Sequence, residues 1–381
     1  MEHRMNRFPE NDIISLVGTP PRYDLGESTR PDLRLADLLD ADALGGLPLG
    51  YGTAAGDPAL RAAIATAHGV AADDVVVTAG GMHALFLLAF VLCGRGDDAV
   101  IATPCFPLAR NALAVVGANI RAARVSFDRG YRLDPPDLRS ALSPRTKLVS
   151  LASPQNPSGV AIPPATLRET MQLMQEICPE AYLLIDETYR EAAYADDPIA
   201  ESALALGPKV ISVASLSKCH GAPGLRIGWA ITRAADLSRQ LVVGKFNTIV
   251  SCPRVDEALA LKLFERRAPI LAERRVLLDA GLQRTAAWVR ANSDHVEWVQ
   301  PDAGALCCIR LGHAAFDDGA VTRFYDAAAA KGIRVARGDW FGEEARVFRL
   351  GFGLLSMAEL GDGLGGLTAA LKETATAGRR T

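Results

Sequence analysis

The stretch SLSKCHGAPGLRIG, residues 215–228, decides how the rest of the chain is interpreted. It places Lys218 directly after Ser215 and Ser217, and before a glycine-rich run that ends near Arg226. A lysine amine forms a covalent imine with an aldehyde, and serine hydroxyls with an arginine are good phosphate ligands. The stretch therefore predicts a site for a covalently held, phosphorylated aldehyde.

Composition narrows the class of protein. A chain of 381 residues usually forms more than one domain, and a net charge of -3 gives no reason to expect nucleic acid or an anionic membrane as partner. The first residues lack an apolar run, and the longest apolar stretch, 84–93, is about half of the ~20 residues that cross a bilayer. Seven cysteines without a CxxC or His cluster indicate reduced thiols and no metal site. We expect a cytoplasmic protein.

Apolar runs alternate with helical patterns along the chain. Strands are expected at 74–78, 99–102, 147–151, 182–186 and 209–213, and helices at 59–67, 164–178 and about 253–290. This alternation predicts an α/β protein with a mostly parallel sheet covered on both faces. Ligands bind at the carboxyl ends of such strands, where the sequence places Thr78, Thr103, Ser153, Asp186 and Ser215.

The long third helix is expected to lead into a second, smaller domain. We predict an N-terminal segment at 1–46 that joins the smaller domain, a large cofactor-binding domain at 47–278, and a C-terminal small domain at 279–381.

Two motifs after predicted strands carry polar side chains suited to bind the ring of a heteroaromatic ligand. Asp186 ends an apolar strand in LLIDETY, residues 183–189, where a carboxylate is costly without a cation or donors. It is either a helix cap or salt-bridge residue, or the partner that keeps a pyridine nitrogen protonated. Tyr189 follows at a reach suited to a ring hydroxyl. Asn156, in SPQNPSG at 153–159, sits in a turn-forming sequence and also offers an amide to a ring oxygen.

Three further segments suit an anion, a ring face and a carboxylate. TAGGMH, residues 78–83, places two glycines at a helix start, where backbone amides bind phosphate. Phe106 is either a core aromatic or a residue that stacks on a planar ring. Arg349 alternates with apolar residues in VFRLGF, so it is either an edge-strand surface charge or a bidentate carboxylate clamp.

In this order, the motifs resemble those of the fold-type I pyridoxal-phosphate enzymes, specifically the class I/II aminotransferase family. The resemblance runs from about Tyr23 to Leu371 and rests mainly on Ser-x-Ser-Lys followed by Gly-x-Arg-x-Gly, with Asp-x-x-Tyr and Asn-Pro-x-Gly upstream. It implies the aspartate aminotransferase-like fold, with a mostly parallel seven-stranded sheet in the large domain and a smaller α+β domain.

The resemblance also implies a role for each candidate residue toward pyridoxal 5'-phosphate. Lys218 would form the internal aldimine, a Schiff base, and act as the catalytic base, with Asp186 and Tyr189 as the other catalytic residues. The residues that would bind the cofactor are Tyr51, Gly81, Met82, Phe106, Asn156, Asp186, Thr188, Tyr189, Ser215, Ser217, Lys218 and Arg226. Those that would bind the substrate are Gly26, Glu27, Asn156 and Arg349.

The family works as a homodimer with shared active sites, and Tyr51 matches the tyrosine that reaches the partner's phosphate. The resemblance implies an aminotransferase acting on an α-amino acid and a 2-keto acid. The alternatives are a lyase, cyclase or oxidase of specialised metabolism, similar to capreomycidine synthase, and a non-catalytic domain that senses the cofactor. Residues Leu25, Gly26 and Glu27 match the N-terminal segment that forms a lid over the substrate in this family. The acidic Glu27 beside the lid glycine, Gly26, is a weak indication of a cationic substrate side chain.

Overall fold

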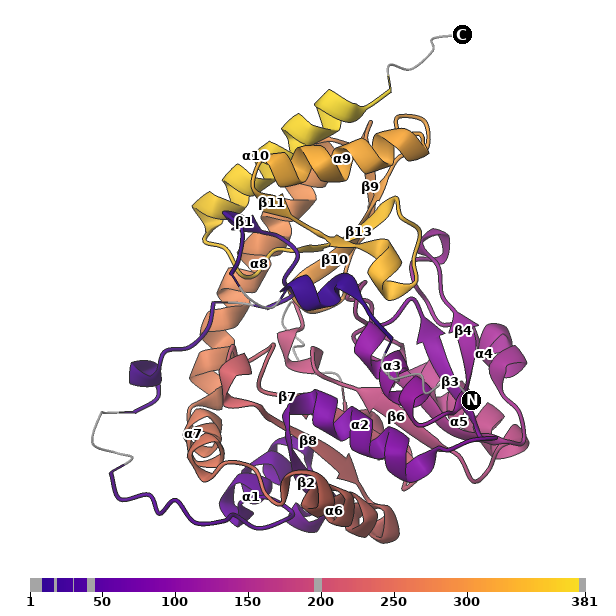
Figure 1. The fold of residues 1–381 in the computed structure, drawn as a ribbon, viewed down its shortest axis with the longest axis vertical. Coiled ribbons are helices and arrows are strands. Elements are labelled where there is room, and N and C mark those ends of the chain that lie inside the picture. The colour runs from indigo at the N-terminus through magenta and orange to yellow at the C-terminus, as the bar shows by residue number, and fades with distance from the viewer. Residues whose placement is uncertain (1–8, 17–18, 30, 40–44, 195–200, 377–381) are drawn as a thin grey trace, which may run out of the picture.

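A seven-stranded sheet brings most of the candidate residues to one edge, and its strands are labelled in Figure 1. In this computed structural model, which describes residues 9–16, 19–29, 31–39, 45–194 and 201–376, the strand order is β2-β8-β7-β6-β5-β3-β4. The strands are β2 (Val75–Ala79), β3 (Asp98–Thr103), β4 (Asn119–Arg124), β5 (Thr146–Ala152), β6 (Tyr182–Asp186), β7 (Val210–Ser215) and β8 (Ile227–Thr232). Each of the five predicted strands is present, with its ends within two residues of the prediction.

The direction of the strands explains why the candidate residues meet. Pairs β3–β4, β3–β5, β5–β6 and β6–β7 are parallel, whereas β8 is antiparallel to both β7 and β2. Strand β2 therefore runs in the same direction as β7. The carboxyl ends of all five predicted strands consequently lie at one edge of the sheet, while β8 returns the chain from the Lys218 loop.

Helices flank this sheet, and one prediction about them is wrong. They are α1 (Pro58–His68), α2 (Gly80–Leu92), α3 (Pro107–Val115), α4 (Pro135–Ala141), α5 (Pro164–Ile177), α6 (Ala235–Ile249), α7 (Arg254–Glu265) and α8 (Arg267–Ala291). The helix expected at 253–290 is divided into α7 and α8 at Arg266. Pro269 explains the break, because its ring clashes with the carbonyl four residues earlier, at Glu265.

A smaller antiparallel sheet lies beyond α8, which runs up to it in Figure 1. Its order is β12-β13-β10-β9, and its strands are β9 (Val296–Val299), β10 (Leu306–Leu311), β12 (Ala336–Arg337) and β13 (Val347–Gly351). Helices α9 (Asp318–Ala330) and α10 (Met357–Thr374) pack on it. Because β13 is an interior strand, Arg349 is not on an edge strand.

The N-terminal segment packs with this second part of the chain. Strand β1 (Tyr23–Asp24) pairs in parallel with β11 (Ile333–Arg334), and the buried Leu25 shares a core cluster with residues between 278 and 371. These contacts support a division near residues 46 and 278, which we keep as a proposal. No helix in the described ranges is both long enough and apolar enough to span a membrane.

Candidate active site

Lys218 lies in the loop that follows β7. Its Nζ is 3.4 Å from Oε2 of Glu27, and 25% of the lysine side chain is exposed. Burial lowers the pKa of the Lys218 amine; Glu27 opposes this shift, whereas Arg349 and Arg226 add to it. A lysine whose pKa is lowered has a larger neutral fraction, which is the form that attacks a carbonyl or accepts a proton.

Asp186 stands at the end of β6, on the strand next to β7. The backbone N–H of Thr188 donates to its Oδ1 over 3.0 Å. Burial raises the pKa of the Asp186 carboxyl, while hydrogen bonds from Thr188 lower it. A cation bound at this carboxylate would remove much of the cost of burying it, as expected of a partner for a protonated ring nitrogen.

Arg349 joins three segments that are distant in sequence. Its Nη1 donates to Oδ1 of Asn156 over 2.8 Å, and its Nη2 donates to the carbonyl of Gly26 over 2.6 Å. The side chain is 2% exposed and its guanidinium lies 4.9 Å from the ring centroid of Phe341. Within the described ranges its Nε has no hydrogen-bond partner. The arrangement leaves the Asn156 amide free to donate and offers a fixed guanidinium to a carboxylate.

Tyr189 has a partner that the sequence did not indicate. Its hydroxyl lies 2.8 Å from the hydroxyl of Ser28, and both side chains are buried. Ser28 follows Glu27 directly, so the N-terminal segment covers Lys218 and Tyr189 together. Only its position beside the predicted lid residues, Gly26 and Glu27, would have drawn attention to Ser28.

The start of α2 forms an anion cradle with the loops around it. Gly80 has a φ of +75°, and a Cβ there would lie 2.3 Å from Nη2 of Arg226. A Cβ at Gly81 would lie 3.9 Å from Oγ of Ser215. Gly228, on β8, packs against the same turn: a Cβ there would come within 2.5 Å of the Gly81 nitrogen. The packing at Gly80 and Gly228 leaves no room for a side chain and so needs glycine. It brings an arginine, a hydroxyl and the first amides of a helix to one place, which fits a phosphate.

Met82 and Ser217 complete the predicted phosphate ligands. Met82 lies in the first turn of α2, and the Ser217 N–H donates to Oγ of Ser215 over 3.4 Å. The structure therefore brings together the five residues predicted for this role, Gly81, Met82, Ser215, Ser217 and Arg226.

Two predicted residues lie at the margin of this group. Phe106 is the residue directly before α3 and is half-buried beside a small apolar cluster that contains Phe341. Tyr51 is 85% exposed and lines a surface hollow of about 180 Å³ with Gly52 and Glu257. A single chain does not bury Tyr51 in the site.

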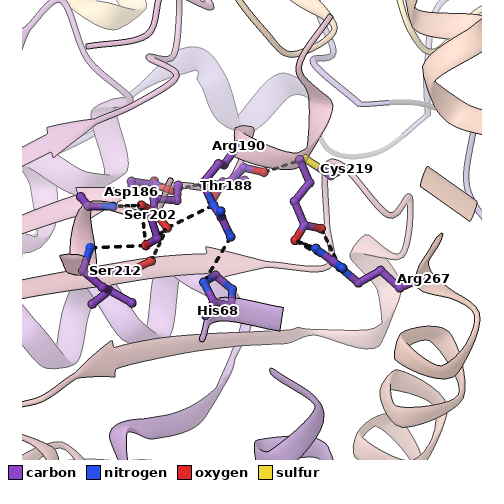
Figure 2. A network of polar contacts seen from close by, with 12 residues as sticks. His68, Asp186, Thr188, Arg190, Ser202, Ser212, Cys219 and Arg267 are labelled. Atoms are coloured by element: carbon purple, nitrogen blue, oxygen red, sulfur yellow. Dashed lines mark hydrogen bonds and ion pairs between the residues drawn. The ribbon is translucent and has the colours of Figure 1, made fainter. Parts of the chain in front are cut away.

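A polar network includes Asp186 and Cys219, the residue that follows Lys218 in the sequence (Figure 2). Glu187 accepts hydrogen bonds from the Ser212 hydroxyl (2.7 Å) and the Ala203 N–H (2.9 Å). Arg190 lies 3.4 Å from Glu187 and 3.3 Å from Nδ1 of His68. The sequence signal for this network was weak, because only the place of Glu187 beside Asp186 set it apart from ordinary acidic residues.

Comparison with known proteins identifies related sequences. The family model for aminotransferase class I and II matches residues 23–364. Capreomycidine synthase of Streptomyces vinaceus is 30% identical over 99% of this chain and 94% of the relative. Arginine–pyruvate transaminase AruH of Pseudomonas aeruginosa is 27% identical over 77% of this chain and 75% of the relative.

Comparison of structures bears on the fold. The solved structure of OrfR, a PLP-dependent cyclase, superposes with a TM-score of 0.86 at 24% identity, covering 98% of this chain and all of that one. The fold predicted from the sequence, that of the PLP-dependent transferases, is confirmed.

Proposed function

The chain belongs to the class I and II aminotransferase family of pyridoxal-phosphate-dependent enzymes, and from this we propose that it transfers an amino group between an α-amino acid and a 2-keto acid. The observation that carries the proposal is the position of Lys218 in the loop after β7. Strand β7 lies next to β6, which ends at Asp186, and β7 itself ends at Ser215 of the anion cradle. An amine, a ring-nitrogen partner and a phosphate site are the groups that this cofactor requires.

The residues around Lys218 fit the cofactor. The cradle of Gly81, Met82, Ser215, Ser217 and Arg226 would hold its phosphate. Asp186 would hold the ring nitrogen, Tyr189 and Asn156 the ring oxygen, and Phe106 and Thr188 the two ring faces. When bound, pyridoxal phosphate supplies an electron sink for charge that develops at the substrate α-carbon.

The protein's own groups bind the substrate and move a proton. Arg349 receives the α-carboxylate, because its buried guanidinium is fixed by Asn156 and Gly26. Lys218 would remove the proton from the α-carbon and, in transamination, deliver it to the cofactor carbon that is bonded to the substrate nitrogen. Burial lowers the pKa of this amine and so enlarges the neutral fraction that can accept a proton. The N-terminal segment around Glu27 and Ser28 covers the site and excludes water.

Glu27 supports a cationic substrate side chain. Its carboxylate is 20% exposed and faces the Lys218 amine at 3.4 Å. Once that amine is bonded to the cofactor, the carboxylate is free to pair with a substrate cation, such as a guanidinium. The name of one relative, arginine–pyruvate transaminase, agrees with such a substrate.

A second candidate function is a lyase, cyclase or oxidase that acts on an amino acid. Its support is the similarity to capreomycidine synthase over nearly the whole chain, together with the fold shared with a PLP-dependent cyclase. The same removal of the α-proton by Lys218 begins these reactions. The lyase, cyclase and oxidase reactions differ from transamination in the step that follows removal of this proton.

We further propose a cytoplasmic homodimer with shared active sites. The large side chains of Tyr51, Phe90 and Phe246 are 85%, 65% and 54% exposed. A groove of about 540 Å³ between α2 and α6 is lined partly by Phe86 and Val243. A second copy on this face would cover these apolar groups and bring Tyr51 to the partner's phosphate site.

The test is a substrate screen on purified protein reconstituted with pyridoxal phosphate. The parent should be yellow, and Lys218→Ala should lose the absorption band of the covalently bound cofactor. Conversion to pyridoxamine phosphate with an amino acid alone supports transamination, and ammonia release without a keto acid supports the second candidate. A parent that stays colourless with excess cofactor would contradict both.

A further inference from the structure

Three consecutive residues after Lys218 anchor its loop to other parts of the chain. The Cys219 thiol donates to the Thr188 carbonyl at 3.1 Å, and Nε2 of His220 lies 2.9 Å from Oε2 of Glu191. The carbonyl of Gly221 accepts from the backbone N–H of Leu33 at 2.9 Å. Two of these contacts, to Thr188 and Glu191, reach the loop that directly follows Asp186, so they relate the position of the Lys218 amine to that of the proposed ring-nitrogen partner.

Glu191 is the central group of these contacts. Its side chain is 9% exposed, and that of His220 is 3% exposed. From the first residue of α8, Arg267 donates to Glu191 Oε1 through Nε at 3.2 Å and also through Nη2. Although burial alone would raise it, the pKa of Glu191 is lowered strongly by His220 and Arg267. An ionised carboxylate is thus held between the Lys218 loop and the helix that leads to the smaller sheet.

The other side of the Asp186 loop is fixed as well (Figure 2). Glu187 is bonded to Ser212 on β7 and to Ser202. Arg190 contacts His68 at the end of α1. Because this loop is held from two directions, Glu191 presents a stationary carboxylate to His220.

The contact between His220 and Glu191 is close but lacks the alignment of a hydrogen bond. The two atoms are close, yet neither ring nitrogen of His220 has a well-aligned partner within the described residues. The ring also packs against Phe264, with centroids 6.1 Å apart. The nearby Glu191 carboxylate and the packing on Phe264, more than one directional bond, hold the imidazole in place.

We propose that the Glu191–His220 pair is a positioning device that sets where Lys218 lies relative to Asp186. This inference rests on the proposed function. The lysine amine has a flexible four-carbon stem, so the position of its backbone decides where the amine is delivered. A displacement of about 1 Å in a reacting group costs on the order of 10²-fold in rate, and His220 is only two residues from Lys218.

The experiment separates positioning from general stability. Glu191→Gln keeps the size of the side chain and removes its charge, and His220→Asn keeps a polar side chain and removes the imidazole. The matched control is Glu176→Gln, because Glu176 also pairs with an arginine, Arg139, but is 58% exposed on α5. Each protein is freed of cofactor and mixed with pyridoxal phosphate, and the rate at which the bound-cofactor absorption band appears is measured, followed by kcat and KM.

We expect Glu191→Gln and His220→Asn to slow the appearance of the band and to lower kcat by roughly 10- to 100-fold, with little change in KM. Because the two residues act as one unit, the double variant should be no slower than the slower single variant. The control should match the parent.

Parental rates in Glu191→Gln, or losses that multiply in the double variant, would overturn the positioning role. If Glu191→Gln does not fold, His220→Asn alone decides between these outcomes. A parent protein that never acquires the band would contradict the proposed function instead, so the two failures are distinct.

Discussion

The guanidinium of Arg349 donates to Oδ1 of Asn156 across 2.8 Å, and this bond ties an interior strand of the small sheet to the loop after β5. Both residues are buried. The proposed carboxylate clamp is therefore assembled only when the two sheets are packed together, so substrate binding at Arg349 would depend on the tertiary structure.

Replacing Arg349 by Ala should weaken binding of α-amino acids by on the order of 2–5 kcal/mol, because a buried ion pair with the substrate carboxylate is lost. Titration of the cofactor absorbance with substrate measures the change. An amine that lacks the carboxylate is the control ligand and should lose little. Equal affinity of parent and variant for the amino acid would place the carboxylate elsewhere.

Replacing Asp186 by Ala should lower turnover by about 10²-fold or more, because the ring nitrogen loses the carboxylate that keeps it protonated. The absorption band of the covalently bound cofactor should still form, since that bond depends on Lys218. Asp186→Asn is the matched variant of equal size and should show a similar loss. Unchanged kcat in either variant would remove the assigned role.

The sequence predicted the strands that carry the site better than the strands around them. Strand β6 was predicted with its observed limits because it is an apolar run ending at Asp186. Strand β4 was missed, since it lies at the sheet edge and exposes much of its polar sequence NIRAAR. Strand β8 was missed because its sequence overlaps the glycine-rich end of the Lys218 motif.

The residues of the candidate site also fall into those that the sequence predicted and those that it missed. Residues with a chemical signature in the sequence, such as Lys218 and Arg226, could be predicted directly from local motifs. Ser28 and Glu191 were not, because a serine or glutamate gains its significance only from the long-range contact it makes, here to Tyr189 and His220. Local pattern carries no information about such contacts.

Replacing Glu27 by Gln should reduce kcat/KM for a cationic amino acid such as arginine relative to a neutral one of similar length. Loss of a hydrogen bond to a charged group costs about 1.5–3 kcal/mol, so selectivity should fall by roughly 10- to 150-fold. Steady-state kinetics with arginine and norleucine measure the ratio. An unchanged ratio would show that Glu27 serves Lys218 alone.

The stability of the cofactor-free protein should fall at mildly acidic pH because of His68. Burial, with a further contribution from Arg190, lowers the pKa of His68 from 6.5 to about 4. Between pH 6.5 and about pH 4, the unfolded chain binds a proton at His68 that the folded protein does not. The free energy of unfolding therefore falls as the pH drops through this range, and below about pH 4 His68 causes no further loss. The loss from this group is about 2 kcal/mol by pH 5. His68→Gln retains an acceptor for Arg190 without titrating, so urea unfolding at pH 7.5 and pH 5 should show a smaller acid-induced loss in the variant. Parallel losses in the two proteins would show that His68 is protonated as readily when folded as when unfolded.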